Sequence, residues 1–567
     1  MAAQEPEEAL PAEAAPVLRT TVHGVVLNAA YGQPLGRALV RIEGEDASGT
    51  LTDGEGRFEI PDVPLGTQAF QVLKPGFRDP FGTNADHFVV VAAKTPPLVF
   101  SLTPTCSISG RVDLSTGDPA NGITVQLLKQ AMKNGRAIWG AFKFIRTSTE
   151  GAYRFGNLPD GVYTLYTQPS TESIRATTLI EPGRAASVEQ SGYPQTFYPN
   201  ARELGGAARI QLSPGEQAQA NMTLALEPFH TVTATILGPD GAVLNPKKDD
   251  GGGHSNGWPA PLLFDTENHE LAYIANYDET THTVQAALPD GTYTMTVAIR
   301  GNAVLGRPVD DGRGREPSHP NYFAGSATFS IAGHAVGDLQ IPLLLPHSYL
   351  LHLRAQEGGA NSGQASHFPT DRLTSAVRVT LGYAGEYVVR ADSERAANIA
   401  GSDAFDLMLA PPFSYWVHTK VYGQGLCAGT LSASGANLAR DPLVLSYSGS
   451  AASMELTVRN DCARLELNLP AALASTGPGV EPVYTVYVVP DFDTTEDVEP
   501  QTLRPSDGEG LTLEGLTPGD YHVYTFTAPV DLEYRNPAAM SQLPTRGQAV
   551  TLSPGRVTAL VLEAPAR

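Results

Sequence analysis

The sequence of 567 residues contains only three cysteines, Cys106, Cys427 and Cys462. So few thiols exclude a disulfide-dense scaffold and a zinc site built on cysteines. The order of the predicted strands brings Cys427 and Cys462 close together at the end of one repeat and the start of the next. We expect a disulfide between them in an oxidising compartment, and two small buried side chains otherwise. Cys106 has no evident partner.

Long apolar runs are also missing, since none approaches the ~20 residues of a membrane-spanning helix. The N-terminal stretch MAAQEPEEALPAEAAP has neither a basic start nor an apolar core, so it is not a signal peptide. We therefore expect either a cytosolic protein or, as the preferred hypothesis, an exported one whose leader has been removed. Residues 1–17 are rich in Ala, Glu and Pro, which predicts a disordered tail or a segment that adds a strand to a neighbouring sheet.

Basic residues are scarce: 38 Lys and Arg stand against 60 Asp and Glu, for a net charge of −22. This balance argues against nucleic acid and anionic membranes as partners, because both attract basic proteins. The hydrophobic fraction of 41% belongs to a folded protein, and the 56 Gly and 45 Pro suit many short strands joined by turns. A chain of this length exceeds one hydrophobic core, so several domains are expected.

One recurring pattern organises the chain, and residues 51–77, LTDGEGRFEIPDVPLGTQAFQVLKPGF, carry its clearest copy. A Gly-rich turn precedes Phe58 and Ile60, whose spacing of two is typical of a strand with one buried face. The turn Pro64-Leu65-Gly66 follows, and a second alternating run begins at Phe70. We interpret this cassette as a β-hairpin.

The cassette recurs at residues 149–163, 284–299 and 507–521, with a degraded copy at 405–418. The repeats predict five domains of one strand order, without long helices: an all-β tandem array of Greek-key β-sandwiches, transthyretin-like or immunoglobulin-like. Junctions of two to four residues predict a semi-rigid rod. The expected domains are 18–104, 105–227, 228–346, the divergent 347–460, and 461–567.

The cassette, T-D-x-x-G-x-F followed by L-x-P-x-G-x-Y, resembles the carboxypeptidase regulatory-like domain, a transthyretin-like β-sandwich. The stretch at 193–199, YPQTFYP, is similar to that of multidomain regulatory-like proteins of Acidobacteria-type bacteria. The resemblance implies the fold but little about function, because such domains accompany many activities. It rests on three sets of residues: Thr52, Asp53, Gly56, Phe58 and Gly66; Gly151, Tyr153, Phe155, Pro159, Gly161 and Tyr163; and Gly510, Leu511, Pro518, Gly519 and Tyr521.

No catalytic motif occurs in the structural context that its chemistry needs: there is no GxSxG elbow or phosphate-binding loop between a predicted strand and a helix, and no HExxH helix. We therefore expect no enzymatic activity, no catalytic residues and no bound cofactor. The acidic loop with Asp491, Asp493 and Asp497 is a candidate site for Ca²⁺, which favours clustered carboxylate oxygens. The simpler interpretation is a solvated loop, because the spacing does not match an EF-hand.

Aromatic residues expected in loops are candidates for stacking on sugar rings. Those singled out are Trp139, Tyr198, Trp258 and Tyr322, with Tyr193, Phe197 and Phe323 beside them. The alternative is that they pack in the core or between domains.

The preferred functional hypothesis is a non-catalytic exported scaffold, adhesion or filament-forming protein that associates through its sheet edges. It would be secreted, periplasmic or on the cell surface. The alternatives are carbohydrate binding through aromatic loops of the second and third domains, and an accessory subunit of a peptidase or transporter.

Overall fold

A computed structural model describes most of the chain beyond residue 17, so the predicted N-terminal tail lies outside the described residues. The described ranges are 18–44, 48–82, 85–172, 190–245, 259–300, 322–344, 348–356, 377–385, 387–388, 395–397, 404–406, 414–423, 425–444, 453–470, 479–480, 482–505 and 510–563.

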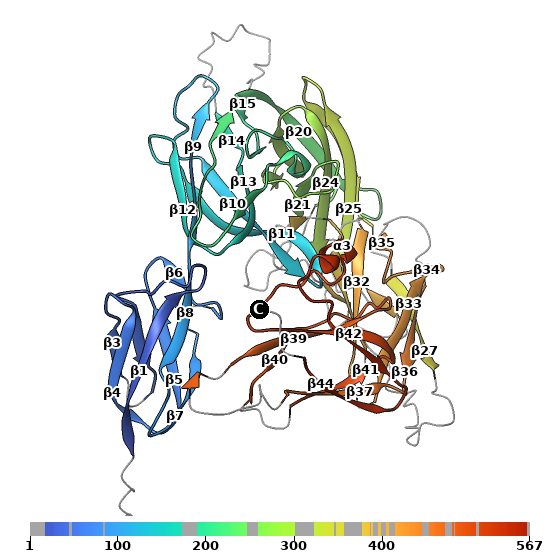
Figure 1. Ribbon diagram of the computed structural model, residues 1–567. Helices are drawn as coiled ribbons and strands as arrows, with labels where there is room; N and C mark the ends of the chain where they lie inside the picture. The colour runs from blue at the N-terminus through green and yellow to red at the C-terminus, as the bar shows by residue number, and fades with distance from the viewer. Residues whose placement is uncertain are drawn as a thin grey trace, which may run out of the picture.

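The protein is built almost entirely of β-strands, which form five sandwiches called here units 1 to 5 (Figure 1). Each unit has two sheets that enclose its own buried hydrophobic cluster. The predicted all-β tandem fold is confirmed. The exact residues at which one unit ends and the next begins remain predictions, because the last strand of one unit is followed almost directly by the first strand of the next. Among the described residues no helix is long and apolar enough to cross a membrane.

Unit 1 consists of β1 (Arg19–Asn28), β2 (Leu39–Ile42), β3 (Ser48–Leu51), β4 (Arg57–Pro64), β5 (Gly66–Leu73), β6 (Phe77–Arg78), β7 (His87–Val91) and β8 (Leu98–Pro104). Unit 2 consists of β9 (Cys106–Leu114), β10 (Thr124–Lys133), β11 (Arg136–Arg146), β12 (Ala152–Leu158), β13 (Gly161–Thr167), β14 (Ser170–Glu172), β15 (Gln190–Tyr193), β16 (Thr196–Phe197), a 3-10 turn (Leu204–Gly206), β17 (Ile210–Leu212), β18 (Gln217–Gln219) and β19 (Met222–Leu224).

Unit 3 consists of β20 (Glu227–Leu237), β21 (Ala260–Phe264), β22 (Ala275–Asp278), β23 (Thr283–Leu288), β24 (Gly291–Arg300), β25 (Tyr322–Ile331) and β26 (Val336–Pro342). Unit 4 consists of β27 (Ser348–Gln356), β28 (Val377–Tyr383), β29 (Tyr387–Val388), β30 (Arg395–Ala397), β31 (Ala404–Asp406), β32 (Ser414–Val421), β33 (Cys427–Ala433), β34 (Ala436–Asn437), β35 (Leu443–Val444) and β36 (Met454–Arg459).

Unit 5 consists of β37 (Ala463–Asn468), β38 (Gly479–Val480), β39 (Tyr484–Pro490), β40 (Gln501–Leu503), β41 (Leu511–Leu516), β42 (Gly519–Phe526), the short helix α3 (Pro537–Ser541), β43 (Gln548–Leu552) and β44 (Val557–Val561).

The same pairing rule holds in all five units. The opening strand of each unit (β1, β9, β20, β27 or β37) pairs antiparallel with β4, β12, β23, β31 or β41. It also pairs in parallel with a closing strand, namely β8, β18 with β19, β26, β36 or β44. The five units are therefore copies of one topology, including the degraded fourth copy.

The cassette is not a hairpin, contrary to the prediction. In unit 1, β4 pairs with β1, whereas β5 pairs with β2 and β7 in the opposite sheet. The turn at Leu65 therefore carries the chain from one sheet to the other. The same crossing separates β12 from β13, β23 from β24 and β41 from β42. The prediction failed because alternation of period two reveals which face of a strand is buried but not which strand it pairs with.

The Tyr of the cassette stabilises this crossing in three units. The Tyr163 hydroxyl donates to the carbonyl of Pro159 at 2.7 Å, and Tyr293 and Tyr521 donate to the carbonyls four residues before them at 3.0 and 2.6 Å. Burial raises the pKa of each of these tyrosines. The repeated L-P-x-G-x-Y spacing therefore encodes a tie between the start of the strand and the turn that precedes it.

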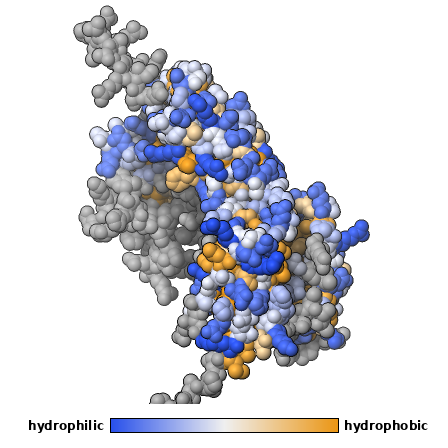
Figure 2. All heavy atoms as spheres, turned by 60° about the vertical axis from the view of Figure 1, so that its left-hand side comes forward, coloured by the Kyte–Doolittle hydropathy of each residue, from blue (hydrophilic) through white to orange (hydrophobic). Residues whose placement is uncertain are grey.

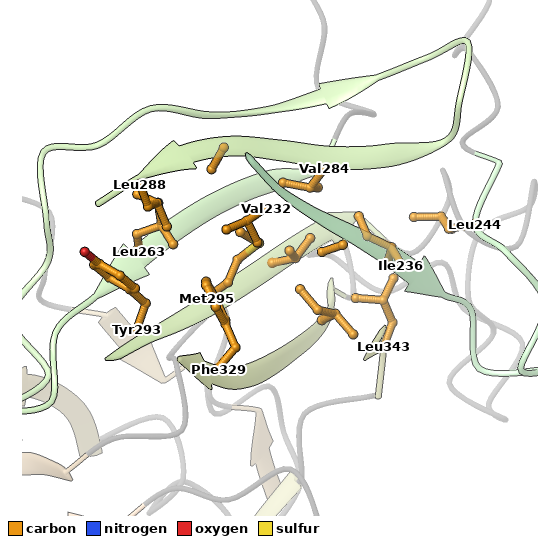
Figure 3. Close-up of a cluster of buried hydrophobic side chains, with 14 of the residues drawn as sticks. Val232, Ile236, Leu244, Leu263, Val284, Leu288, Tyr293, Met295, Phe329 and Leu343 are labelled. Atoms are coloured by element: carbon orange, nitrogen blue, oxygen red, sulfur yellow. The ribbon is translucent and has the colours of Figure 1, made fainter. Parts of the chain in front are cut away.

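The core of unit 3 illustrates how the two sheets meet. Val232 and Ile236 on β20 face Met295 on β24 and Phe329 on β25, and their side chains point into one shared layer (Figure 3). Three of these four side chains are completely buried. At ~25 cal/mol per Å² of apolar surface, such layers provide the main stabilisation of each unit.

The units do not form a rod, contrary to the prediction. Units 2 and 3 lie beside each other, unit 4 lies next to unit 3, and unit 5 turns back between units 4 and 1 (Figure 1). Short junctions restrict the swing between neighbours, but they do not set the direction in which each unit leaves the preceding one. Contacts between units far apart in sequence decide that direction.

Candidate functional site

Strands of one unit extend the sheet of another at three places, and these shared sheet edges form the first part of the candidate site. Between units 2 and 3, β15 pairs antiparallel with the first residues of β20, from Gln190 opposite Phe229 to Gly192 opposite Glu227. The amide of Ala272 donates to Gln195 Oε1 at 2.8 Å, and the amide of Gln195 donates to the Tyr273 hydroxyl at 3.2 Å. Units 2 and 3 thus share one continuous sheet.

The second shared edge joins units 2 and 4. The two residues of β29 pair in parallel with Trp139 and Gly140 near the start of β11. The third shared edge joins the first and last units, where Gly479 and Val480 of β38 pair antiparallel with Val90 and Val89 of β7. The three pairings use backbone hydrogen bonding, which depends little on side-chain identity.

A polar junction of units 2, 4 and 5 forms the second part of the site. Arg535 of unit 5 lies against the tip between β10 and β11, and its Nε donates to the carbonyl of Asn134 at 3.0 Å. Its other nitrogens donate to the carbonyls of Thr494 and Glu496 at 2.8 and 2.9 Å. The amide of Arg535 also donates to the carbonyl of Gly135 at 3.0 Å. One guanidinium therefore holds two units together through its fixed fork of donors.

His418 of unit 4 completes this junction. Its Nδ1 lies 2.8 Å from Asp497 Oδ1 of unit 5, and its side chain is almost fully buried. Beside it, the guanidinium of Arg136 stacks on the Trp416 ring, 3.5 Å from the ring centroid. Burial, together with the nearby positive charge of Arg535, lowers the pKa of Arg136 to about 10. The junction thus combines a His–Asp pair with a stacked cation, an arrangement that fastens domains together.

A cleft of about 530 Å³ opens between units 4 and 5 next to this junction. Arg378 and Lys420 line one wall, and Glu496 and Gln501 line the other. Burial raises the pKa of Glu496 to about 7, against the opposing effect of a hydrogen bond from the backbone of Ala428. Lys420 is paired with Glu499 at 3.0 Å, so the cleft is a polar crevice crossed by ion pairs between the units.

Cys427 and Cys462 form a disulfide, with an S–S distance of 2.05 Å and a Cα–Cα distance of 5.8 Å. Cys427 begins β33 and lies opposite Arg459 at the end of β36, three residues before Cys462. The bond thus links a strand of unit 4 to the start of unit 5. Cys106 is buried and its thiol donates to the carbonyl of Ser213 at 3.1 Å, while burial raises its pKa.

The aromatic residues proposed for sugar stacking do not form a common exposed surface. Trp139 was expected in a loop, but it lies in β11 with 3% of its surface exposed, packed in a cluster with Phe197 and Leu204. Tyr193 and Phe323 are buried too, and Tyr198 is half-buried against the core of unit 2. A ring that is covered on both faces cannot stack on a sugar, so Trp139 is corrected to a packing residue.

Two further sugar-stacking candidates cannot be placed in the same way. Trp258 lies outside the described residues. Tyr322 begins β25, but its side chain is also outside them.

The acidic loop disperses its carboxylates instead of gathering them. Asp491 pairs with His522 at 2.8 Å, and Asp493 pairs with Arg440 at 2.5 Å. Asp497 pairs with both His418 and Arg535. Within the described part of the chain no group of three acidic, histidine or cysteine side chains could hold a metal ion. Asp497 instead belongs to the junction between units, a role that the sequence analysis missed. The sequence shows only that Asp497 belongs to an acidic run. Its proximity to Arg535 arises from the fold, and no local pattern in the sequence reveals it.

Comparison with known proteins identifies the first unit. Residues 21–103 match the family model of the carboxypeptidase regulatory-like domain, which confirms the resemblance over that range. No curated protein sequence matches the chain.

Among solved structures, a Bacillus anthracis TIE protein is similar at 13% identity and a TM-score of 0.17, over 57% of this chain and about half, 51%, of that one. A streptococcal ancillary pilin is similar at 11% identity and a TM-score of 0.18, over 57% of this chain and 99% of the pilin. The minor pilin GBS52 of Streptococcus agalactiae is similar at 14% identity and a TM-score of 0.18, over 36% and 95%. Such low TM-scores carry no argument about function.

Proposed function

We propose that this chain is a non-catalytic, exported protein whose β-sandwich units associate through their sheet edges, as a scaffold, adhesion or filament component. The observation that carries this proposal is the repeated use of strand addition: β15 on β20, β29 on β11 and β38 on β7. A chain that joins its own units by edge pairing has edges whose geometry accepts an added strand. The same edges are the natural means of contact with another molecule.

The disulfide supports the exported location. Disulfides persist in oxidising compartments such as the periplasm and the extracellular space, whereas cytosolic reductants keep most thiols reduced. Protein trapped with an alkylating reagent directly from its native source should therefore expose a single thiol after unfolding, that of Cys106. Three alkylated thiols would place the protein in a reducing compartment.

The polar residues of the described junction connect units to one another. His418, Asp497 and Arg535 bind one another or backbone carbonyls, and all of them lie between units. Carbohydrate binding is the weaker proposal, because Trp139 is buried.

The decisive test is light scattering coupled to size-exclusion chromatography, over a concentration series, with the full chain and with a variant lacking residues 1–17. Species larger than the monomer are expected in the full chain. Their loss on removal of the tail would mean that the tail donates the strand, and their persistence would assign the contact to edges within residues 18–567. A monomer under all conditions would refute self-assembly and direct the search to other protein partners.

A further inference from the structure

The edge strands of the described units differ in how well they resist pairing with another molecule. β4 contains Pro61 and several charges, β12 contains Arg154, and β41 contains Glu514. Charged residues and prolines are the usual means by which an edge strand avoids association. These three edges are therefore protected by their own sequences.

β7 of unit 1 lacks this protection. Its sequence is His-Phe-Val-Val-Val, with neither proline nor a formally charged residue, and β5 pairs with it along its whole length on one side. Val89 and Val91 are buried, so the strand belongs to the core of the unit. An unprotected apolar edge of this kind is a template for an added strand.

That edge is covered by a distant segment of the same chain. β38 of unit 5 pairs with Val89 and Val90 of β7, about 390 residues away in sequence, where it is the short orange arrow beside β5 and β7 (Figure 1). In the sequence, Pro478 directly precedes the two residues and Pro482 follows after Glu481, and since proline cannot donate to a ladder the added strand has little room to lengthen. The guanidinium of Arg504 adds a contact over the Phe88 ring at 5.0 Å.

The contact between units 1 and 5 is thus specific in register but small. Unit 1 is also joined to unit 2 by the short segment between β8 and β9. Near this segment the Tyr31 hydroxyl donates to the carbonyl of Pro214 at 3.2 Å, and the amide of Thr105 donates to the carbonyl of Gly76 at 2.9 Å. A contact of only two paired residues opens more often than the whole fold unfolds. On opening, β7 is left with a bare edge.

We propose that β38 of one copy adds to β7 of a second copy, so that the chains join head to tail by exchanging the strand that each otherwise keeps for itself. The inference deepens the proposed function, on which it rests, by naming the acceptor edge and the donor strand. Because the acceptor lies on unit 1 and the donor on unit 5, the contact is heterologous and one copy leaves a free end for the next. The products are open chains of increasing length, not only dimers.

Concentration decides between the closed monomer and the exchanged chain. Within one molecule the donor reaches the acceptor at an effective concentration on the order of millimolar. Exchange should therefore be minor at micromolar protein and increase toward millimolar protein, or wherever the protein is held densely on a surface.

Cysteine trapping tests this proposal in the full-length chain. Val90→Cys and Gly479→Cys place thiols on residues that face each other across β7 and β38, in a background with Cys106→Ala. The protein is incubated from about 1 µM to about 1 mM, a range that brackets the effective concentration, then oxidised and separated on a non-reducing gel. The matched control carries Val99→Cys and Val557→Cys, which are exposed positions of units 1 and 5 on strands that do not pair.

The expected result is a cross-linked monomer at low concentration and a ladder of dimers, trimers and longer species at high concentration. The control pair should give no comparable ladder. A variant with Gly479→Pro and Val480→Pro, which removes both amide donors of β38, should lose the concentration-dependent species in light scattering while units 1 to 5 retain their melting transitions.

Four results would overturn the proposal. The first is that the cysteine variant gives only cross-linked monomer at every concentration while the unmodified protein still forms larger species. This would refute strand exchange, and the proposed self-assembly would then use another sheet edge. A ladder equally strong in the control pair would mean random collision. Larger species that survive the double proline substitution would likewise assign association to a different surface. An unmodified protein that stays monomeric throughout would refute the proposed self-assembly as well.

Discussion

Removing the disulfide between Cys427 and Cys462 should lower the stability of unit 4 by several kcal/mol. The bond closes a loop of 35 residues that contains β33, β34, β35 and β36. In the chain-entropy treatment, such a cross-link restricts the unfolded chain and stabilises the fold by about 4 kcal/mol at 25 °C. For a unit of roughly a hundred residues that corresponds to a decrease in melting temperature of about 15–20 °C.

Differential scanning calorimetry of the full-length chain measures this effect directly. The variant Cys427→Ala with Cys462→Ala should shift one transition downward and leave those of units 1 and 2 in place. The matched control is Cys106→Ala, which removes a buried thiol with no covalent partner. Adding a reductant should lower the same transition in the unmodified protein, but should have no effect in the double variant.

The reasoning would be refuted if the reductant left every transition of the unmodified protein unchanged. A shift of the same transition in the double variant would refute it as well, because the reductant would then act through something other than this bond.

Three further predictions concern single side chains. Burial raises the pKa of Glu496 from its ordinary 4.5 to about 7, so between these pH values the folded protein binds a proton that the unfolded chain releases. The contribution of the protonated Glu496 to stability is present below about pH 4.5 and is lost as the pH rises through 7, a loss of about 3 kcal/mol. Glu496→Gln should abolish this pH dependence in melting curves. Gly110→Ala would push a Cβ against the carbonyl oxygen of Ala220 and should cost about 1–3 kcal/mol in denaturant titrations, whereas Gly140→Ala meets open space and should be neutral or slightly stabilising. Arg535→Ala leaves several carbonyls at the junction without a donor, so small-angle X-ray scattering should record a larger radius of gyration; an unchanged radius would contradict the role given to this residue.

The all-β class and the number of units were readable from the sequence because the signals are local. Turn residues such as Gly56 and the alternation of Phe58 and Ile60 act within one strand and its turn, and β4 follows as expected. The repeated Tyr of the cassette was also recognisable, because it lies at a fixed distance in sequence from its hydrogen-bond partner, as Tyr163 does from Pro159. The assignment of the strands to hairpins was wrong because pairing partners are chosen across the core.

The candidate site was mostly hidden from the sequence for the same reason. Asp497, His418 and Arg535 come from different parts of two units, and no pattern along the chain relates them. Trp139 was mistaken for a loop residue because an aromatic side chain on a strand beside Gly140 carries no local sign of burial. Only the packing of other side chains of unit 2, among them Phe197 and Leu204, covers it.

The sequence by itself determined what each segment is: a strand or a turn, with one buried face, repeated five times by local geometry and apolar spacing. The tertiary structure decided which strands pair, where β38 and β29 add to other units, and why the chain turns back instead of forming a rod. The physical reason is that backbone hydrogen bonds at a sheet edge are nearly independent of sequence. Any exposed strand offers them, and only the three-dimensional path of the chain determines which edge receives which strand.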